Sequence, residues 1–142
     1  MTVIKTAYSS KGLIHFTVGA IIKKGDKILL IDRKNIPLGF AGIAGHVDLR
    51  ETPEQALIRE VKEESNLDIL GYNLLFEETF NDNPCVYNAK NHHWYVFECE
   101  TRKTEPMKNN EAKSIGWYSK EEIKDLELED SWKRIFKKLG VI

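Results

Sequence analysis

The chain has 142 residues, of which 42% are hydrophobic and 30% charged, and its formal net charge is −1. This length suits one domain with a real core, and the composition is typical of soluble globular proteins. The balanced charge gives no electrostatic footprint for general nucleic-acid binding, and no stretch is long and apolar enough to span a membrane. The first six residues lack the apolar core of a signal peptide, so we expect a cytoplasmic enzyme or binding domain. Cys85 and Cys99 follow no pattern, which favours free thiols in packing positions.

Strand and helix patterns alternate along the chain. β-branched and aromatic residues predict strands, clusters of Gly, Pro and Asn predict loops, and capping residues predict where helices begin. In chain order, the expected elements are a strand over 14–23, a turn at Gly25-Asp26, a paired strand over 27–33, a loop over 34–43, a short strand over 44–47, a helix over 53–65, a strand over 72–80, a polar loop over 81–91, a strand over 92–100, a short strand over 115–118, a small helix to about 126 and a last helix ended by Gly140. Interleaved strands and helices predict one α/β domain over residues 1–142.

Both ends of the 53–65 helix are well signalled. Thr52, with Gln55 three residues later, fits a capping box. Pro53 falls at the first helical position, where its missing N–H costs nothing. Asn66 falls where the helix should end, and asparagine tolerates the left-handed conformation of such caps.

Two closing helices follow the last predicted strand. Ser119 with Glu122 repeats the capping-box pattern, and Asp130 is the expected cap of the last helix. That helix carries an apolar stripe formed by Trp132, Ile135, Phe136 and Leu139. Such a stripe is most simply the side that faces the core, whereas an exposed version would be the surface of a homodimer.

Three glutamates, Glu60, Glu63 and Glu64, lie at positions i, i+3 and i+4 of the predicted 53–65 helix. These spacings make the side chains neighbours on the helix surface, where like charges destabilise the helix. On a helical wheel the three carboxylates border the side that carries Leu57 and Val61, not the solvated side. Hard cations take oxygen ligands, so the cluster predicts a divalent-metal site for chemistry on a phosphate. The alternative is an ordinary solvated, glutamate-rich helix face.

A longer pattern surrounds these glutamates in residues 45–67. The motif G-x5-E-x7-R-E-U-x-E-E-x-G-U, in which U is a bulky aliphatic residue, is matched at the required spacings by Gly45, Glu51, Arg59, Glu60, Val61, Glu63, Glu64 and Leu67. The segment therefore resembles the Nudix box. Asn66 replaces the late glycine of the motif but keeps its conformational role. Ala44, Asp48 and Arg50 also depart from residues common in the family.

The resemblance to Nudix domains implies an α/β/α sandwich, in which helices flank a mixed, curved sheet. It also implies hydrolysis of a nucleoside diphosphate linked to another group, with Mg²⁺ or Mn²⁺ as cofactor. By the same resemblance, Glu60, Glu63, Glu64 and the Gly45 carbonyl hold the metal, and Glu60 or Glu63 acts on the attacking water. Arg59 and Glu51 would pair with each other and orient the site.

The resemblance also implies a second acidic residue from outside the box, as general base or extra metal ligand. Glu111 is the first choice, ahead of Glu98 and Glu100, because it precedes the 115–118 strand in an order similar to that of Nudix domains. The alternative for Glu111 is a solvated loop glutamate. Arg33 ends the 27–33 strand, where it can meet a phosphate or remain a surface charge.

Histidine and aromatic residues give weaker signals for substrate binding. His46, beside the expected metal, either touches a phosphate or is a neutral surface histidine. Trp94 can stack on a base, although core packing is the simpler role for a strand tryptophan. His92 and His93 do not form a metal pair, because adjacent strand residues face opposite sides of the sheet.

The expected substrate is a nucleotide such as a non-standard NTP, ADP-ribose or a dinucleotide. The alternative function is a Nudix-fold module that binds nucleotides or regulates another activity without turnover. Intact Glu60, Glu63 and Glu64 argue against it, since inactive relatives typically lose them. Decapping of mRNA is disfavoured because no basic surface for RNA is present. The leaving group and the base stay open, because loops 34–43, 81–91 and 101–112 carry no readable motif.

Overall fold

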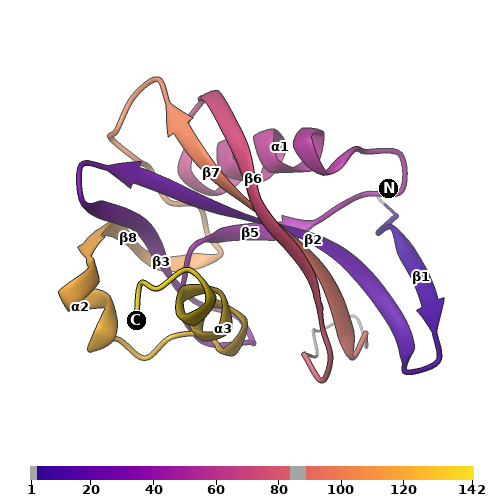
Figure 1. Ribbon diagram of the computed structural model, residues 1–142. Helices are drawn as coiled ribbons and strands as arrows, with labels where there is room; N and C mark the ends of the chain where they lie inside the picture. Colours follow the sequence, from indigo (N-terminus) through magenta and orange to yellow (C-terminus); the bar gives the residue numbers. More distant parts are fainter. Residues whose placement is uncertain (1–2, 84–88) are drawn as a thin grey trace.

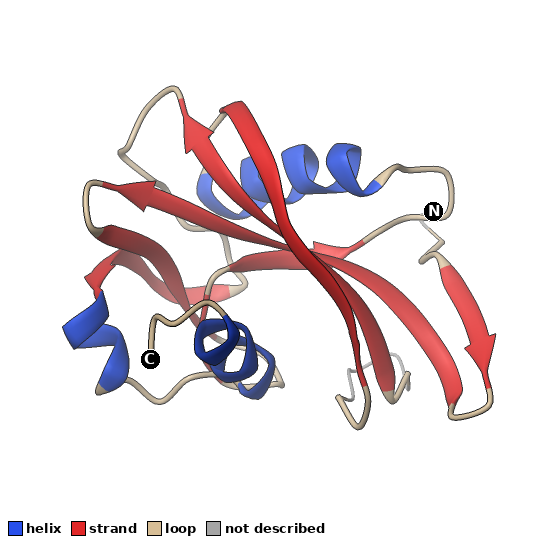
Figure 2. Cartoon of the chain, in the orientation of Figure 1, coloured by secondary structure: helices blue, strands red, loops and turns tan. Residues whose placement is uncertain are grey.

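The computed structural model describes residues 3–83 and 89–142. These residues form a mixed sheet with helices on both of its faces (Figure 2). In chain order the elements are β1 (Thr6–Ser9), β2 (Gly12–Lys24), β3 (Lys27–Arg33), β4 (Gly39–Ala41), β5 (Ile43–His46), α1 (Pro53–Ser65), β6 (Ile69–Phe80), β7 (Asn91–Thr101), β8 (Ala112–Ser119), α2 (Lys120–Lys124) and α3 (Asp130–Lys138).

Strand β2 lies at the centre of the sheet, whose main path runs β4-β3-β2-β7-β6, with β1 and β5 also paired to β2 and β8 paired to β3. The β2–β7 pair is parallel and the other pairs are antiparallel. β2 pairs with β3 at Lys23 and Lys24, and with β5 from Thr17 to Ala20. The sheet therefore divides along β2 into a branch with β3, β4 and β8 and a branch with β5, β7 and β6 (Figure 1).

One helix covers each face of this sheet (Figure 1). α1 packs Leu57 and Val61 into a core with Val18 of β2, and α3 packs Trp132 into a second core with Ile21 of the same strand. Successive strand residues point to opposite faces, so even and odd residues of β2 supply the two cores. Each such side chain contributes roughly 1.5–3 kcal/mol on burial. The predicted α/β/α sandwich with a mixed, curved sheet is confirmed.

The apolar stripe of α3 faces the core. Trp132 is 1% exposed, and Ile135 and Phe136 are fully buried. A Cβ atom at Gly42 would lie 2.4 Å from the Trp132 ring, so glycine is required beneath the indole. The interpretation of this stripe as an exposed dimer surface is therefore wrong, and the core interpretation is confirmed.

Both predicted ends of α1 are confirmed. The Thr52 hydroxyl accepts a hydrogen bond from the Gln55 N–H at 3.1 Å, and the Gln55 side chain accepts from the Thr52 N–H at 3.0 Å. Caps of this kind contribute typically ~1 kcal/mol. Asn66 closes the helix in the left-handed conformation, with φ 60° and ψ 19°, and its N–H donates to the Lys62 carbonyl. Asparagine here does what the motif glycine would do.

Several local predictions differ from the structure. β1 was not predicted, because four mostly exposed residues carry no hydrophobic alternation. β4 lies inside the expected 34–43 loop and is held by its pairing to β3. The cap of α3 is Glu129 and not Asp130: the buried Glu129 carboxylate accepts from the Ser131 and Trp132 N–H groups. Asp130 instead pairs with Arg134 at 3.0 Å.

Strand ends also shift from their predicted positions. β6, β7 and β8 each begin before the expected residue, at Ile69, Asn91 and Ala112. Residues 84–88 of the expected 81–91 loop, with Cys85, lie outside the described part of the chain. Cys99 is a buried free thiol, as expected. Among the described residues, no helix has both the length and the apolar character needed to cross a membrane.

Candidate active site

Two of the three clustered glutamates are buried between α1 and the sheet. Glu64 is 4% exposed, and the Glu60 side chain is 14% exposed. Glu63 differs from them, since its side chain is 55% exposed at the rim. The helix therefore places two carboxyl groups against the sheet and one at the surface, in agreement with the expectation that the cluster borders the buried side.

Gly45 in β5 makes the room for Glu60. A Cβ atom at this position would lie 2.0 Å from the carboxyl carbon of Glu60, so any larger residue would displace that group. The Gly45 carbonyl accepts a hydrogen bond from the Thr17 hydroxyl at 2.8 Å. The glycine that opens the motif is thus explained by a close approach of helix and strand.

Arg59 ties the segment before α1 to the helix. Its guanidinium donates to both oxygens of Glu51, at 2.7 and 2.8 Å, and to Glu60 at 2.7 Å. It also donates to the His46 carbonyl at 3.0 Å and to Glu63 at 3.3 Å. Hydrogen bonds from Arg59 hold the pKa of Glu51 below its usual value. The geometry shows the expected Arg59–Glu51 pair and adds a direct contact to Glu60.

The buried carboxyl groups have raised pKa values. Burial raises the pKa of Glu60, and hydrogen bonds from Arg59 oppose this effect. Burial, followed by the negative charge of Glu60, raises the pKa of Glu64 well above its usual value. The two carboxyl groups hydrogen-bond to each other, and the second oxygen of Glu64 is buried without a hydrogen-bond partner. Such a pair is stable when it shares a proton or contacts a cation.

Glu111 approaches this pair because its loop is fastened to the end of α1. The Asn109 side chain donates to the Glu63 carbonyl at 3.1 Å, and the Met107 N–H donates to the Ser65 carbonyl at 2.9 Å. The Asn109 side chain also accepts from the Glu111 N–H at 2.9 Å. The charge of Glu111 contributes to the raised pKa of Glu64. Asn109 was missed by sequence reasoning, because an asparagine in a polar loop carries no signal of its own.

Arg33 supplies positive charge on the other branch of the sheet. Its Nε donates to the Pro37 carbonyl at 2.6 Å, which holds the guanidinium at the end of β3. Its charge lowers the pKa of Glu64 and also that of His46. Arg33 is therefore close to the carboxylate pair, while Glu98 is not part of it and pairs with Lys23 at 3.1 Å.

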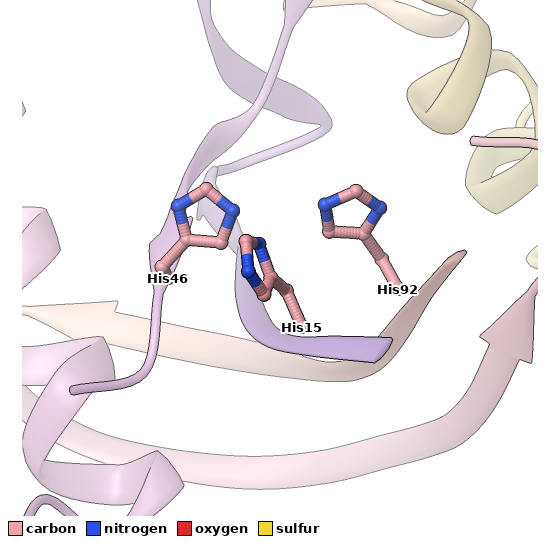
Figure 3. Close-up of side chains that lie close together, drawn as sticks. All are labelled: His15, His46 and His92. Carbon is pink, nitrogen blue, oxygen red and sulfur yellow. The ribbon is translucent and has the colours of Figure 1, made fainter. Parts of the chain in front are cut away.

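His46 and Trp94 point to the α3 side of the sheet, away from Glu60. Trp94 is 6% exposed in the core with Trp132, and its Nε1 donates to the Asn83 side chain, which supports the packing alternative. His46 is half-buried beside His15 and His92, so it is not a simple surface histidine (Figure 3). This group of three histidines was also missed. Its only sequence signal is one histidine near the end of each of three predicted strands.

Comparisons with known proteins point to the same family as the geometry of the site. The family model described as NUDIX domain matches residues 13–139. Over 52 residues the chain is 52% identical to an ADP-ribose pyrophosphatase of Methanocaldococcus jannaschii; the match covers 35% of this chain and 31% of that protein.

Solved structures show the same architecture. A bifunctional NMN adenylyltransferase/ADP ribose pyrophosphatase of Francisella tularensis, complexed with AMP and a Mn ion, is 27% identical, with a TM-score of 0.66 over 88% of this chain and 41% of that one. A MutT NUDIX hydrolase of Burkholderia pseudomallei is 23% identical, with a TM-score of 0.75 over 87% of this chain and 96% of that one. From the Nudix box, the sandwich fold and the match over residues 13–139, we conclude that the chain belongs to the NUDIX domain family.

Proposed function

We propose that the chain is a divalent-cation-dependent pyrophosphohydrolase, which cleaves the diphosphate linkage of a nucleoside diphosphate joined to a second group. The observation that carries the proposal is the facing pair of Glu60 and Glu64, buried together against Gly45. Two buried carboxylates at one place are costly unless a cation or a proton is shared between them. The buried Glu64 oxygen without a hydrogen-bond partner fits a cation ligand.

The proposed ligands of the cation are Glu60, Glu64 and the Gly45 carbonyl oxygen, with Glu63 at the exposed rim. All are oxygen donors, which Mg²⁺ and Mn²⁺ prefer over nitrogen or sulfur. A bound cation would supply charge neutralisation at the phosphate oxygens. The raised pKa values of Glu60 and Glu64 describe the metal-free protein, in which burial disfavours their charged forms.

The surrounding residues have positioning and proton-transfer roles in this proposal. Arg59 holds Glu60 and Glu51 in place through its hydrogen bonds and does not touch the substrate. Arg33 attracts a phosphate of the substrate to the mouth of the site. Glu111 accepts the proton of the attacking water, with Glu63 as the alternative base. Both carboxylates are exposed beside the buried pair, and such general-base assistance typically contributes ~10²–10⁴-fold.

ADP-ribose is the first substrate to test. The relative from Methanocaldococcus jannaschii and the Francisella tularensis protein both carry an ADP-ribose pyrophosphatase name. Water would add across the diphosphate of ADP-ribose and release AMP and ribose 5-phosphate. Nucleoside triphosphates, which the resemblance to the Nudix box also implies, would release a monophosphate and pyrophosphate and form the second class.

The test is a panel of ADP-ribose, a dinucleotide and nucleoside triphosphates with Mg²⁺, scored by chromatographic separation of products. We expect AMP and ribose 5-phosphate from wild type, and no turnover in EDTA or with Glu64→Gln. Glu98→Gln is the matched control, because Glu98 pairs with Lys23 far from the carboxylate pair. Binding of ADP-ribose without hydrolysis of any nucleotide would instead support the alternative of a nucleotide-binding module.

A further inference from the structure

Three histidines converge on the face of the sheet opposite to Glu60 and Glu64. Figure 3 shows the rings of His15, His46 and His92 turned toward one another. One ring nitrogen from each residue lies within 4.8 Å of the other two. The ring centroids are 5.0 Å apart for His15 and His46, and 5.7 Å apart for His92 and each of the others.

Strand pairing brings these residues together from distant parts of the chain. The parallel β2–β7 register sets His15 directly beside His92. In the antiparallel β2–β5 pair, His46 is opposite Thr17, two residues along β2 from His15 and on the same face. Each ring is therefore carried by a hydrogen-bonded strand, and the positions of the three residues are fixed before any ligand arrives.

The cluster offers three imidazole rings, two of which are almost fully buried. His15 and His92 are 4% exposed. Burial lowers the pKa of His92 to about 4. Burial also lowers the pKa of His15. Neutral imidazole, which carries a free lone pair on one nitrogen, is the usual histidine ligand.

A polar atom of the cluster lacks a hydrogen-bond partner. His92 Nδ1 is buried and makes no hydrogen bond among the described residues. The Asn83 backbone nevertheless lies close enough to the His92 ring to raise its pKa against the effect of burial. A second group near the ring nitrogen fixes the orientation and tautomer of a histidine ligand, as is usual in metal sites.

We propose that His15, His46 and His92 form a second cation site, separate from the carboxylate site, which binds a borderline transition metal such as Zn²⁺. Imidazole suits zinc, cobalt and nickel, whereas Mg²⁺ takes oxygen ligands, so the two sites select different ions. Three histidines with an open fourth position are a recurrent zinc arrangement. Tetrahedral zinc needs nitrogens about 3.4 Å apart, so binding requires the rings to turn inward from their present separations of up to 4.8 Å.

A metal at this site would link β2, β5 and β7 next to the carboxylate site. His46 immediately follows Gly45, whose carbonyl and close approach to Glu60 belong to the carboxylate site. The ion would therefore hold the chain at Gly45 from the opposite face. The competing explanation is that the three rings form an edge-to-face packing cluster, since the ring pairs that include His15 are nearly perpendicular.

The test measures zinc directly in protein prepared without a histidine tag. Metal-free protein is loaded with Zn²⁺ in the presence of excess Mg²⁺, which occupies the carboxylate site. The protein is then desalted, and its zinc content is measured by inductively coupled plasma mass spectrometry. We expect about one zinc ion per chain. Cobalt loading gives a second readout, because tetrahedral Co²⁺ absorbs in the visible range and Zn²⁺ displaces it. Glu64→Gln should retain both signals.

The matched pair of variants is His92→Asn and His93→Asn. The two residues are adjacent on β7, but His93 faces the other side of the sheet and bonds to Thr79 and Glu77. We expect His92→Asn to lose the zinc and the cobalt spectrum, and His93→Asn to keep them. His46→Asn, at a less buried position, should also lose the metal and serves if His92→Asn fails to fold. Wild type without bound zinc, or equal zinc in His92→Asn, His46→Asn and wild type, would overturn the proposal in favour of ring packing.

Discussion

The two faces of the sheet bury ionisable groups of opposite kinds, acids on one face and bases on the other. On the α1 side, Glu60 and Glu64 are acids whose pKa values are raised by burial, so the fold favours their protonated form. On the α3 side, His46 and His92 are bases whose pKa values are lowered by burial, and the fold again favours the neutral form. Burial thus acts against the charged form in both clusters, but one offers oxygen atoms and the other offers nitrogen atoms.

This difference means that the two clusters respond in opposite directions to pH and to the type of metal ion. The carboxylate pair releases protons when it takes up a hard cation, so higher pH favours its loading. The histidines are already deprotonated at neutral pH. Substitutions on one face should therefore leave the ion preference of the other face unchanged, and the predictions below separate the two.

The largest expected effect is on turnover with Glu64→Gln. The substitution keeps the shape of the side chain but removes the charge that a cation needs. We expect hydrolysis of the preferred nucleotide to fall by at least about 10²-fold, because stabilisation by the metal is worth several kcal/mol. Steady-state rates at saturating Mg²⁺ measure this, with Glu98→Gln as the control. Equal rates for the two variants would mean that Glu64 is not part of the catalytic site.

The next effect concerns the space above Gly45. Gly45→Ala would place a methyl group 2.0 Å from the Glu60 carboxyl carbon, so that carboxyl group must move. A shift of about 1 Å in a catalytic group costs about 10²-fold in rate. Gly71→Ala is the matched control, because nothing lies within 4 Å of a Cβ atom there. Full activity in Gly45→Ala would show that the position of Glu60 does not matter for the reaction.

In EDTA, the free energy of unfolding should change with pH in opposite directions for the groups on the two faces of the sheet. The unfolded chain protonates its histidines near pH 6.5, but the folded chain keeps His92 neutral to about pH 4. This stability is complete above pH 6.5 and is lost as the pH falls toward 4, by about 2–3 kcal/mol. Glu64 has a raised pKa, so its contribution is complete below pH 4.5 and is lost as the pH rises through the folded value.

Urea unfolding from pH 4 to pH 8 measures both changes in the free energy of unfolding, the loss toward low pH and the loss toward high pH. His92→Asn should reduce the loss on the acid side and leave the loss toward high pH. Glu64→Gln should do the reverse, and in EDTA at pH 8 it should be more stable than wild type. The same slope in both variants would contradict the assignment of opposite pKa shifts to the two faces.

The smallest effect is at the end of α1. Asn66 occupies the left-handed region at φ 60°, which glycine enters freely. Asn66→Gly should therefore be nearly neutral, while Asn66→Val should lose on the order of 1–2 kcal/mol. Thermal melts of the two variants make the comparison. Equal melting temperatures would show that the helix does not depend on a left-handed residue at this position in solution.

The features that could be predicted from the sequence are those set by spacing within one element. The α1 bounds, the Thr52 cap and the left-handed Asn66 follow from residues in α1 or next to it, whereas the Arg59–Glu51 pair was implied by the resemblance to the Nudix box. Features that depend on tertiary register could not be predicted in this way. The histidine cluster needs the parallel β2–β7 pairing, and the approach of Glu111 needs the hydrogen bonds made by Asn109.

Errors at element ends have the same origin. Asp130 has the better intrinsic preference for a helix cap, but the chain turns so that the buried Glu129 side chain reaches the first N–H groups of α3. β4 has no strand pattern of its own and exists because β3 offers it hydrogen bonds. Local preference was overruled in both places by contacts from elsewhere in the fold.

The most direct test of the central claim is a titration of metal-free protein with Mn²⁺, followed by the electron paramagnetic resonance signal of the free ion. The carboxylate pair should bind Mn²⁺ in wild type and in His92→Asn, and excess Mg²⁺ should displace it. Glu64→Gln should bind Mn²⁺ at least about 10-fold more weakly. Absence of binding in wild type, or equal binding in Glu64→Gln, would contradict the assignment of Glu60 and Glu64 as ligands of a catalytic divalent cation.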